Sequence, residues 1–264
     1  MRAARSSGPG PHSVSAVLPA YNEEAVIADT VRRTHAALAS CAPATFEVIV
    51  VDDGSTDQTR RRCEDVAAEL GGVRVLSHGE NRGYGAALRS GFEQAAGDAV
   101  FLMDSDGQFD PADLRRLLEH WSATAVVCGC RVERSDSFIR RLNNRAFFRL
   151  VTLAFGRTAR DVNCGFKLFP RALGQGLSAD GALVSTELLV RARSQGFTIV
   201  DVPVPHYPRL TGRPTGARPA VVLRAFGELW RLRGQLHRPQ GQPHPAPAGR
   251  ETTTPAAARP GRSL

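Results

Sequence analysis

Short apolar runs alternate along the chain with longer segments in which apolar residues recur at helical spacing. The apolar runs predict five buried strands, at Val14–Leu18, Phe46–Val51, Val73–Ser77, Ala99–Met103 and Ala125–Cys130. The helical patterns between them run from an N-cap at Asn22 to about Ser40, from Thr56 or Asp57 onward, over Gly83–Ala96 and over Pro111–His120. Because strand and helix alternate repeatedly, we expect an α/β, Rossmann-like fold with a mostly parallel sheet and helices on both faces.

Polar and glycine residues gather where the predicted strands end. The segments that follow the first four strands are Pro19–Glu23, Asp52–Ser55, Asn81–Gly85 and Asp104–Gln108. Ligands of open parallel sheets bind outside the carboxyl ends of the strands. The sequence therefore predicts one site built from these four loops.

Asp104, Asp106 and Gln108 form the strongest single feature. Two carboxylates two residues apart and a nearby amide can all reach one Mg²⁺ or Mn²⁺, which takes oxygen ligands and commonly bridges to substrate phosphates. An EF-hand is excluded because its glycine and glutamate positions hold Phe109 and Arg115. The alternative is a hydrated turn, since Asp, Ser and Gly all favour turns.

Asp52 and Asp53 suit the ring N–H or the ribose hydroxyls of a nucleotide, although they could also cap the following helix. Gly83 and Gly85 resemble part of a glycine-rich phosphate loop. Leu88 occupies the third glycine position of GxGxxG, and no GxxxxGK[ST] is present. A dinucleotide-binding domain and a P-loop NTPase are therefore disfavoured.

The ordered motifs of the chain resemble those of glycosyltransferase family 2, in particular the dolichol- or polyprenyl-phosphate mannose (or glucose) synthase branch. The segments that carry the resemblance are VSAVLPAYNEEAVI (Val14–Ile27), VDDGSTDQT (Val51–Thr59), NRGYGAALRSGFEQA (Asn81–Ala95), DSDGQFDP (Asp104–Pro111), DVNCGFKLF (Asp161–Phe169), ELLVRARSQG (Glu187–Gly196), VPV (Val202–Val204) and RLTG (Arg209–Gly212). They span about Val14 to Arg218.

The resemblance implies a GT-A fold and inverting transfer from a nucleotide-sugar to a polyprenyl-phosphate acceptor. It places the donor nucleotide against the segments after the first three strands, at Pro19, Tyr21, Asn22, Glu23, Asp52, Asp53, Gly54 and Gly83. It makes Asp104, Asp106 and Gln108 the ligands of Mg²⁺ or Mn²⁺. It puts Arg131 and Arg209 at the acceptor phosphate. The family often has a lysine at the place of Thr215, and here Arg213 is the nearby cation.

The acceptor chemistry leaves alternatives open. A phosphate acceptor is already an anion and needs little general-base help, whereas a hydroxyl acceptor needs a base. Asp161 and Glu187 are candidates for that base, or they hold loops by hydrogen bonds. A hydroxyl-directed transferase and a non-catalytic nucleotide-sugar-binding module are therefore the competing hypotheses.

The net charge of +8 is unevenly distributed. The Arg-, Ser- and Gly-rich arm 1–13 and the Pro- and Arg-rich tail 238–264, both expected to be disordered, carry +5 of it, and the segment Arg131–Arg160 has a local charge of +6. The rest of the body is therefore acidic. Aromatic residues make up 6% and are not interleaved with basic ones, so nucleic acid is not the expected partner.

Two basic, amphipathic segments are candidates for contact with an anionic membrane, Phe138–Phe155 and Ala220–His237 (as a helix over 219–237), or for ordinary core packing. No signal peptide and no transmembrane run is apparent.

The five cysteines lack a metal-site spacing and are expected to be reduced thiols. The sequence thus predicts a glycosyltransferase domain over 14–218 in a cytoplasmic protein that attaches reversibly to the inner face of the cell membrane.

Overall fold

The structure, a computed structural model, describes residues 10–41, 43–132, 152, 156, 158–179, 181 and 183–209. Within these ranges the strands are β1 (Ser13–Ala20), β2 (Thr45–Asp52), β3 (Val73–Ser77), β4 (Ala99–Met103), β5 (Ala125–Val132), β6 (Phe166–Pro170) and β7 (Thr198–Pro205). The helices are α1 (Ile27–Cys41), α2 (Thr59–Glu69), α3 (Tyr84–Gln94), α4 (Leu114–Leu118), α6 (Arg171–Gly174) and α7 (Leu183–Ser194), with a 3₁₀ turn at Pro111–Asp113.

The strands form one sheet in the order β3-β2-β1-β4-β6-β5-β7. Neighbouring strands are parallel except at β6, which runs antiparallel to both β4 and β5. The predicted α/β fold with a mostly parallel sheet is confirmed. Because β1 to β4 are adjacent and parallel, their carboxyl ends share one edge, as the sequence predicted.

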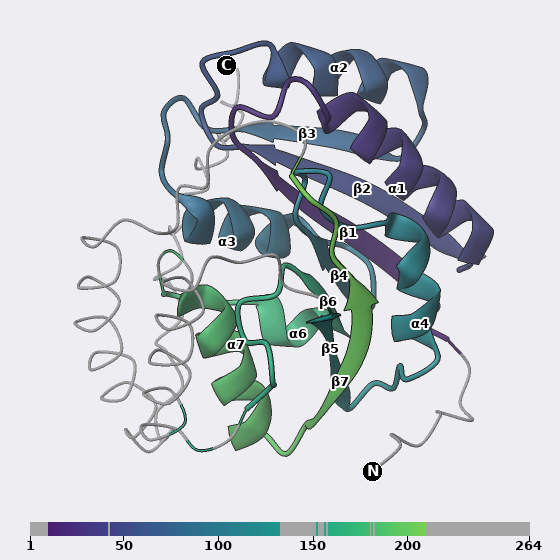
Figure 1. The fold of residues 1–264 in the computed structure, drawn as a ribbon, viewed down its shortest axis with the longest axis vertical. Coiled ribbons are helices and arrows are strands. Elements are labelled where there is room, and N and C mark those ends of the chain that lie inside the picture. Colours follow the sequence, from purple (N-terminus) through teal and green to yellow (C-terminus); the bar gives the residue numbers. More distant parts are fainter. Residues whose placement is uncertain are drawn as a thin grey trace, which may run out of the picture.

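Helices cover both faces of the sheet (Figure 1). On one face Ile27 and Leu38 of α1, Val66 of α2 and Leu117 of α4 are buried against the strands. On the other face α3, α6 and α7 contribute the second apolar cluster. Gly91 lets α3 approach β1 closely, since a β-carbon there would lie 2.3 Å from Cγ1 of Val17.

The helix starts differ from those expected. Asn22 is not the N-cap of the first helix, because α1 begins at Ile27 and Asn22 has a left-handed backbone with φ of 55°. The second helix begins at Thr59, later than Thr56 or Asp57. Asn22 and Thr56 instead lie in two loops that are hydrogen-bonded to each other before the helices begin.

Several predicted features fall outside the described residues. These are Arg213, Thr215, the segment Phe138–Phe155 apart from Thr152, the helix 219–237 with Ala220–His237, and both tails apart from residues 10–13. In the described part of the chain, no helix combines the length and apolar character that crossing a membrane requires. The five cysteines, all of them described, form no disulfide.

Candidate active site

The loops that follow β1 to β4 are joined by hydrogen bonds at the carboxyl edge of the sheet. Asp53 donates its backbone N–H to the carbonyl of Ala20 (2.9 Å), and Ser105 donates its hydroxyl to the carbonyl of Pro19 (2.6 Å). His78, just after β3, donates its backbone N–H to the carbonyl of Asp52 (2.9 Å). The predicted convergence of the four loops is therefore present.

Asp104 follows the last residue of β4 and is held from two sides. Its backbone N–H donates to the carbonyl of Gly165 (2.9 Å), and its Oδ1 accepts the hydroxyl of Tyr84 (2.8 Å). A β-carbon on Gly165 would lie 1.9 Å from Oδ2 of Asp104, so the carboxylate packs directly over the glycine. Tyr84 and Gly165 thus hold Asp104 in place, and neither was predicted as a site residue although both lie in the family-like segments.

Asp106 and Glu23 both lie beside the guanidinium group of Arg209. Nη2 of Arg209 lies 2.7 Å from Oδ2 of Asp106 and 3.4 Å from Oε1 of Glu23. Arg209, expected near an acceptor phosphate, thus stands directly beside the carboxylates expected to hold a metal.

The electrostatics of these carboxylates follow from their burial. Burial and the charge of Asp106 raise the pKa of Asp104 to about 6. Burial also raises the pKa of Glu23 to about 7, although Arg209 opposes the rise. Desolvation where its hydroxyl packs against Asp104, together with the charge of Asp104, raises the pKa of Tyr84 well above its usual value, although part of the residue is exposed; the hydroxyl therefore stays protonated and donates. Desolvation is therefore the main cause of each of these shifts.

Gln108 is fixed by the segment after β7. Its side-chain Nε2 donates to the backbone carbonyl of Tyr207 (3.0 Å), and the backbone carbonyl of Gln108 accepts the N–H of Tyr207 (2.9 Å). Because the amide nitrogen is committed to the backbone, the amide oxygen is the atom left to face a cation.

These residues fit a divalent metal ion. Asp104, Asp106 and Gln108 offer oxygen donors only, which suits Mg²⁺ or Mn²⁺, and the raised pKa of Asp104 marks a place where added positive charge stabilises the ionised carboxylate. Across the described ranges no group of three or more His, Cys, Asp and Glu side chains is arranged to hold a metal ion. Two carboxylates and one amide would leave coordination positions for water and for substrate oxygens.

Asp52 and Asp53 are both buried and accept hydrogen bonds from the protein itself. Asp52 accepts the N–H of Ser55 (3.2 Å) and the hydroxyl of Ser77 (3.0 Å). Asp53 accepts the N–H groups of Arg82 (3.0 Å) and Gly83 (2.8 Å). The two carboxylates therefore shape the loops on the side of the site where a nucleotide is expected.

The loop after β1 is tied to the loop after β2. Asn22 accepts the N–H of Thr56 on its side-chain oxygen (2.8 Å) and donates its own N–H to the hydroxyl of Ser55 (3.0 Å). Gly54 must be glycine, because its φ is 70° and a β-carbon there would lie 2.3 Å from the carbonyl carbon of Glu80. Asn22 and Gly54 thus have architectural roles that a capping interpretation misses.

Three tyrosines are exposed on these loops. Tyr21 follows β1, Tyr84 begins α3 and Tyr207 follows β7, and they are also the only tyrosines in the sequence. Exposed aromatic rings beside buried carboxylates provide flat surfaces for a base or a sugar ring.

Arg131, near the end of β5, is paired with Asp161. Its Nε and Nη2 lie 2.7 and 2.9 Å from the two carboxylate oxygens, and both side chains are largely buried. Asp161 was predicted either as a general base or as a residue that holds a loop by hydrogen bonds. Because both of its carboxylate oxygens are bonded to Arg131, the structure favours the second role.

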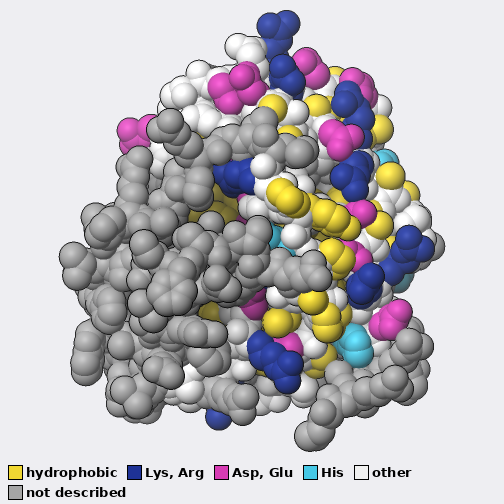
Figure 2. Space-filling view, in the orientation of Figure 1, with side chains coloured by type: hydrophobic (Ala, Val, Ile, Leu, Met, Phe, Trp, Pro, Cys, Tyr) yellow, Lys and Arg dark blue, Asp and Glu magenta, His cyan; other side chains and the backbone are white. Residues whose placement is uncertain are grey.

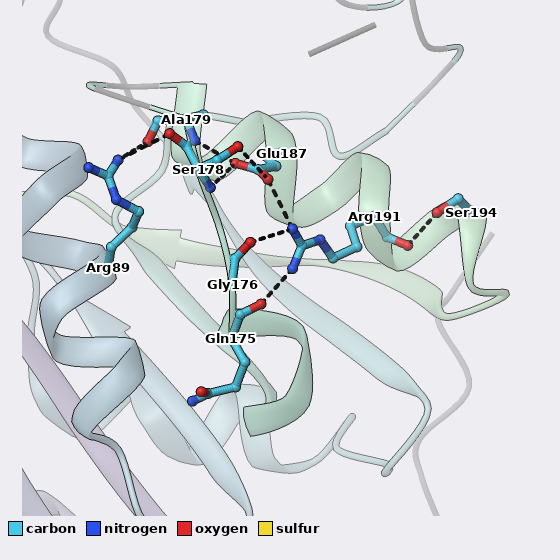
Figure 3. Close-up of polar contacts among 8 residues, drawn as sticks. All are labelled: Arg89, Gln175, Gly176, Ser178, Ala179, Glu187, Arg191 and Ser194. Carbon is cyan, nitrogen blue, oxygen red and sulfur yellow. Dashed lines mark hydrogen bonds and ion pairs between the residues drawn. The ribbon is translucent and has the colours of Figure 1, made fainter. Parts of the chain in front are cut away.

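Glu187, the other candidate base, is also engaged (Figure 3). Its carboxylate accepts the N–H groups of Ser178 (2.8 Å) and Ala179 (2.7 Å) and pairs with Arg191 (3.0 Å). Arg89 of α3 reaches the carbonyl of Ala179 from the opposite side. Glu187 therefore holds the segment before α7, which agrees with the loop-holding alternative.

Residues 15–175 match the family model described as "Glycosyl transferase family 2". Glycosyltransferase AglD of Haloferax volcanii is 36% identical over 209 residues, which cover 74% of this chain and 33% of that protein. The undecaprenyl-phosphate 4-deoxy-4-formamido-L-arabinose transferase of Pseudomonas aeruginosa is 38% identical over 169 residues, covering 63% and 49%. The chain thus spans about a third to a half of the length of these curated relatives.

Among solved structures, glucosyl-3-phosphoglycerate synthase from Mycobacterium tuberculosis superposes with a TM-score of 0.65 at 24% identity, covering 84% of this chain and 80% of that one. That protein was crystallised with Mn²⁺, UDP-glucose and phosphoglyceric acid, and in another crystal with Mg²⁺ and UDP. The likeness confirms the predicted GT-A fold.

Proposed function

This chain belongs to glycosyltransferase family 2, and from that premise we propose that it transfers a sugar from a nucleotide-sugar to a polyprenyl phosphate, with inversion at the anomeric carbon. One observation carries the proposal: at the carboxyl edge of the sheet lie the oxygen donors Asp104, Asp106 and Gln108, and Arg209 forms an ion pair with Asp106. A relative at 38% identity bears the name of an undecaprenyl-phosphate sugar transferase, which supports this acceptor class.

The donor would lie across the loops after β1, β2 and β3. Asp52 and Asp53 order these loops, and Asn22, Gly54 and Gly83 set their backbone shape. In this proposal the nucleotide contacts Pro19, Tyr21, Glu23 and the pair of aspartates. Because the carboxylates of Asp52 and Asp53 are already hydrogen-bonded, we expect their main effect to be on loop geometry.

Asp104, Asp106 and Gln108 would hold Mg²⁺ or Mn²⁺. When bound, the cation supplies positive charge for the diphosphate of the departing nucleotide. The protein contributes the orientation of its ligands: Tyr84 and Gly165 fix Asp104, and Tyr207 fixes Gln108.

The acceptor phosphate would approach from the side of Arg209, with Arg131 and Arg213 as further cations. An arginine presents a planar fork of donors that matches a phosphate. A phosphate acceptor is already ionised and requires little general base. The commitment of Asp161 to Arg131 and of Glu187 to the 178–179 backbone favours such an acceptor over a hydroxyl, because neither candidate base is poised for proton removal.

We also propose that the protein works at an anionic membrane surface on the cytoplasmic side. The support is chemical: a polyprenyl phosphate resides in a membrane, and Phe138–Phe155 and Ala220–His237 combine arginines with large apolar residues.

A donor panel tests the proposed function. Purified protein is incubated with GDP-mannose, UDP-glucose or UDP-N-acetylglucosamine, with Mg²⁺ or Mn²⁺, and with either a polyprenyl phosphate or a free saccharide. We expect a sugar-lipid from one donor and none of the saccharide product. Products on the saccharide alone would favour a hydroxyl acceptor, and nucleotide-sugar binding without turnover would indicate a non-catalytic module.

A further inference from the structure

The side chain of His78, just after β3, is buried and hydrogen-bonded at both ring nitrogens. Its Nδ1 is 2.7 Å from Oδ1 of Asp53, and its Nε2 is 3.0 Å from the hydroxyl of Ser90 on α3. The side chains of His78 and Asp53 are only 7% and 4% exposed. An ionised carboxylate accepts hydrogen bonds and cannot donate, so Nδ1 carries the proton that it shares with Asp53. The ring therefore connects β2 to α3.

Asp53 also binds the backbone just before the first turn of α3. Its two oxygens also accept the backbone N–H groups of Arg82 and Gly83, at 3.0 and 2.8 Å. Gly83 has φ of 91°, a conformation that side-chain-bearing residues rarely adopt, and α3 begins at the next residue. The carboxylate thus stabilises an unusual turn and fixes where the helix starts.

Tyr84 completes the connection to the metal side of the site. As the first residue of α3, it donates its hydroxyl to Oδ1 of Asp104 at 2.8 Å. A continuous series of contacts therefore runs from His78 through Asp53 and the Gly83 turn to Tyr84 and Asp104. It links the loop expected at the nucleotide to a carboxylate expected at the metal.

We propose that His78 is a positioning residue for the transfer reaction. It sets the turn that places the Tyr84 hydroxyl on Asp104, and so it aligns the donor side of the site with the metal side. The inference rests on the proposed function. An imidazole suits this role because one rigid ring can reach a carboxylate and a hydroxyl from opposite ends, whereas asparagine could reproduce only the bond to Asp53.

The test measures Mn²⁺ binding in the presence of UDP or of GDP, by electron paramagnetic resonance of free Mn²⁺. Outer partners of metal ligands typically contribute about 10- to 100-fold to metal affinity. Tyr84 is such a partner of Asp104 and His78 would act through it, so we expect His78→Ala to weaken Mn²⁺ binding by roughly 10-fold, the low end of that range. His78→Asn should recover part of the loss, and Ser90→Ala should cause a smaller one.

His35→Ala is the matched control. The ring of His35 on α1 is likewise hydrogen-bonded, here to the carbonyl of Gly71 at 3.1 Å, and it packs against Phe46 near the start of β2, at the end of the sheet opposite Asp104. Both alanine variants should lower the thermal midpoint, but only His78→Ala should change Mn²⁺ affinity. If the two variants bind Mn²⁺ equally well, His78 has a purely structural role and the inference is wrong. If His78→Ala does not fold, His78→Asn and Ser90→Ala are compared with the control in the same way.

A double-mutant cycle with Tyr84→Phe tests the route. If His78 acts through Tyr84, the double variant should bind Mn²⁺ about as weakly as the weaker single variant. If the losses of Mn²⁺ affinity in the two single variants multiply in the double variant, the two residues act independently and the proposed connection is wrong. Failure of the wild-type protein to bind Mn²⁺ with either nucleotide would instead contradict the proposed function and the inference with it.

Discussion

At the scale of single residues, the contact between Gly165 and Asp104 leaves no room for a β-carbon. A β-carbon at this position would lie 1.9 Å from the carboxylate, far below van der Waals contact. A side chain at residue 165 must therefore displace Asp104, because the glycine itself is held by its carbonyl bond to the Asp104 N–H.

We predict that Gly165→Ala lowers the transfer rate on the order of 100-fold, since a displacement of about 1 Å in a reacting group can cost that much. Steady-state rates with donor and acceptor saturating measure the effect. Gly71→Ala is the control, because a β-carbon there meets nothing within 4 Å. Equal rates for the two variants would contradict the assigned role of Gly165.

The residue chemistry of the site was only partly predictable from the sequence. Asp104, Asp106 and Gln108 stand out because adjacent oxygen donors after a strand are visible as a pattern. Tyr84 and Gly165 are far from Asp104 along the chain, and no local spacing marks their contact with it. Asn22 was predicted as a helix cap because its residue type favours caps, but its side chain binds Thr56 instead.

At the scale of secondary-structure elements, Glu47 joins three strands and a helix end. From β2 it accepts the hydroxyl of Ser15 on β1 (2.6 Å) and the N–H of Ala96 after α3 (2.8 Å), and it pairs with Arg74 of β3 (2.8 Å). Burial alone would raise the pKa of this carboxyl, but these hydrogen bonds and the arginine outweigh burial and lower it. The packing of β1, β2, β3 and the end of α3 at the amino-terminal side of the sheet thus depends on the ionisation of Glu47.

We predict that Glu47→Gln lowers the free energy of unfolding by about 2 kcal/mol at neutral pH, the size expected for hydrogen bonds to a charged group. The pKa of Glu47 is lowered in the folded state. Its contribution is therefore complete above the ordinary value of 4.5 and is lost as the pH falls through the folded-state pKa. Urea unfolding between neutral and acidic pH should show that the difference in unfolding free energy from wild type disappears below that value.

Glu64→Gln is the control, because Glu64 forms an exposed pair with Arg60, and its difference from wild type should be small at every pH. A pH-independent gap for Glu47→Gln would contradict this explanation.

Most elements followed from periodicity, and the exceptions have physical reasons. β3 and β4 have the predicted bounds, because both are short apolar runs. β6 was not predicted as a strand because Lys167 interrupts its apolar pattern. The lysine is nevertheless fully buried, and its ammonium group donates to the carbonyl of Cys164. The predicted helix 111–120 divides into a 3₁₀ turn and the short α4.

At the scale of the whole molecule, the charge is distributed by segment. On the face drawn in Figure 2, arginine side chains and acidic side chains are interspersed over the described surface. The concentration of arginine in the sequence lies in Arg131–Arg160 and in the C-terminal segments. This distribution favours local contacts with phosphate groups over a broad polyanion-binding face.

We predict that the protein sediments with anionic liposomes at low salt and is released as salt rises, because screening weakens charge attraction. Basic residues near an anionic surface contribute about 1 kcal/mol each. Replacing Arg141, Arg145 and Arg149 together with glutamine should therefore weaken binding on the order of 100-fold. Sedimentation that is absent, or unchanged in the triple variant, would exclude Phe138–Phe155 as the attachment segment.

The central claim is that the carboxyl edge of the sheet catalyses sugar transfer to a lipid phosphate. The most direct measurement is the rate at which radiolabelled sugar passes from a nucleotide-sugar to undecaprenyl phosphate in wild type, Asp104→Asn and Asp98→Asn. Asp98 immediately precedes β4 and so lies at the opposite end of the strand from Asp104, where it accepts the hydroxyl of Ser13. We predict transfer by wild type and Asp98→Asn and a loss of at least about 100-fold in Asp104→Asn. Equal transfer by both variants, or no sugar-lipid from any donor, would contradict the account.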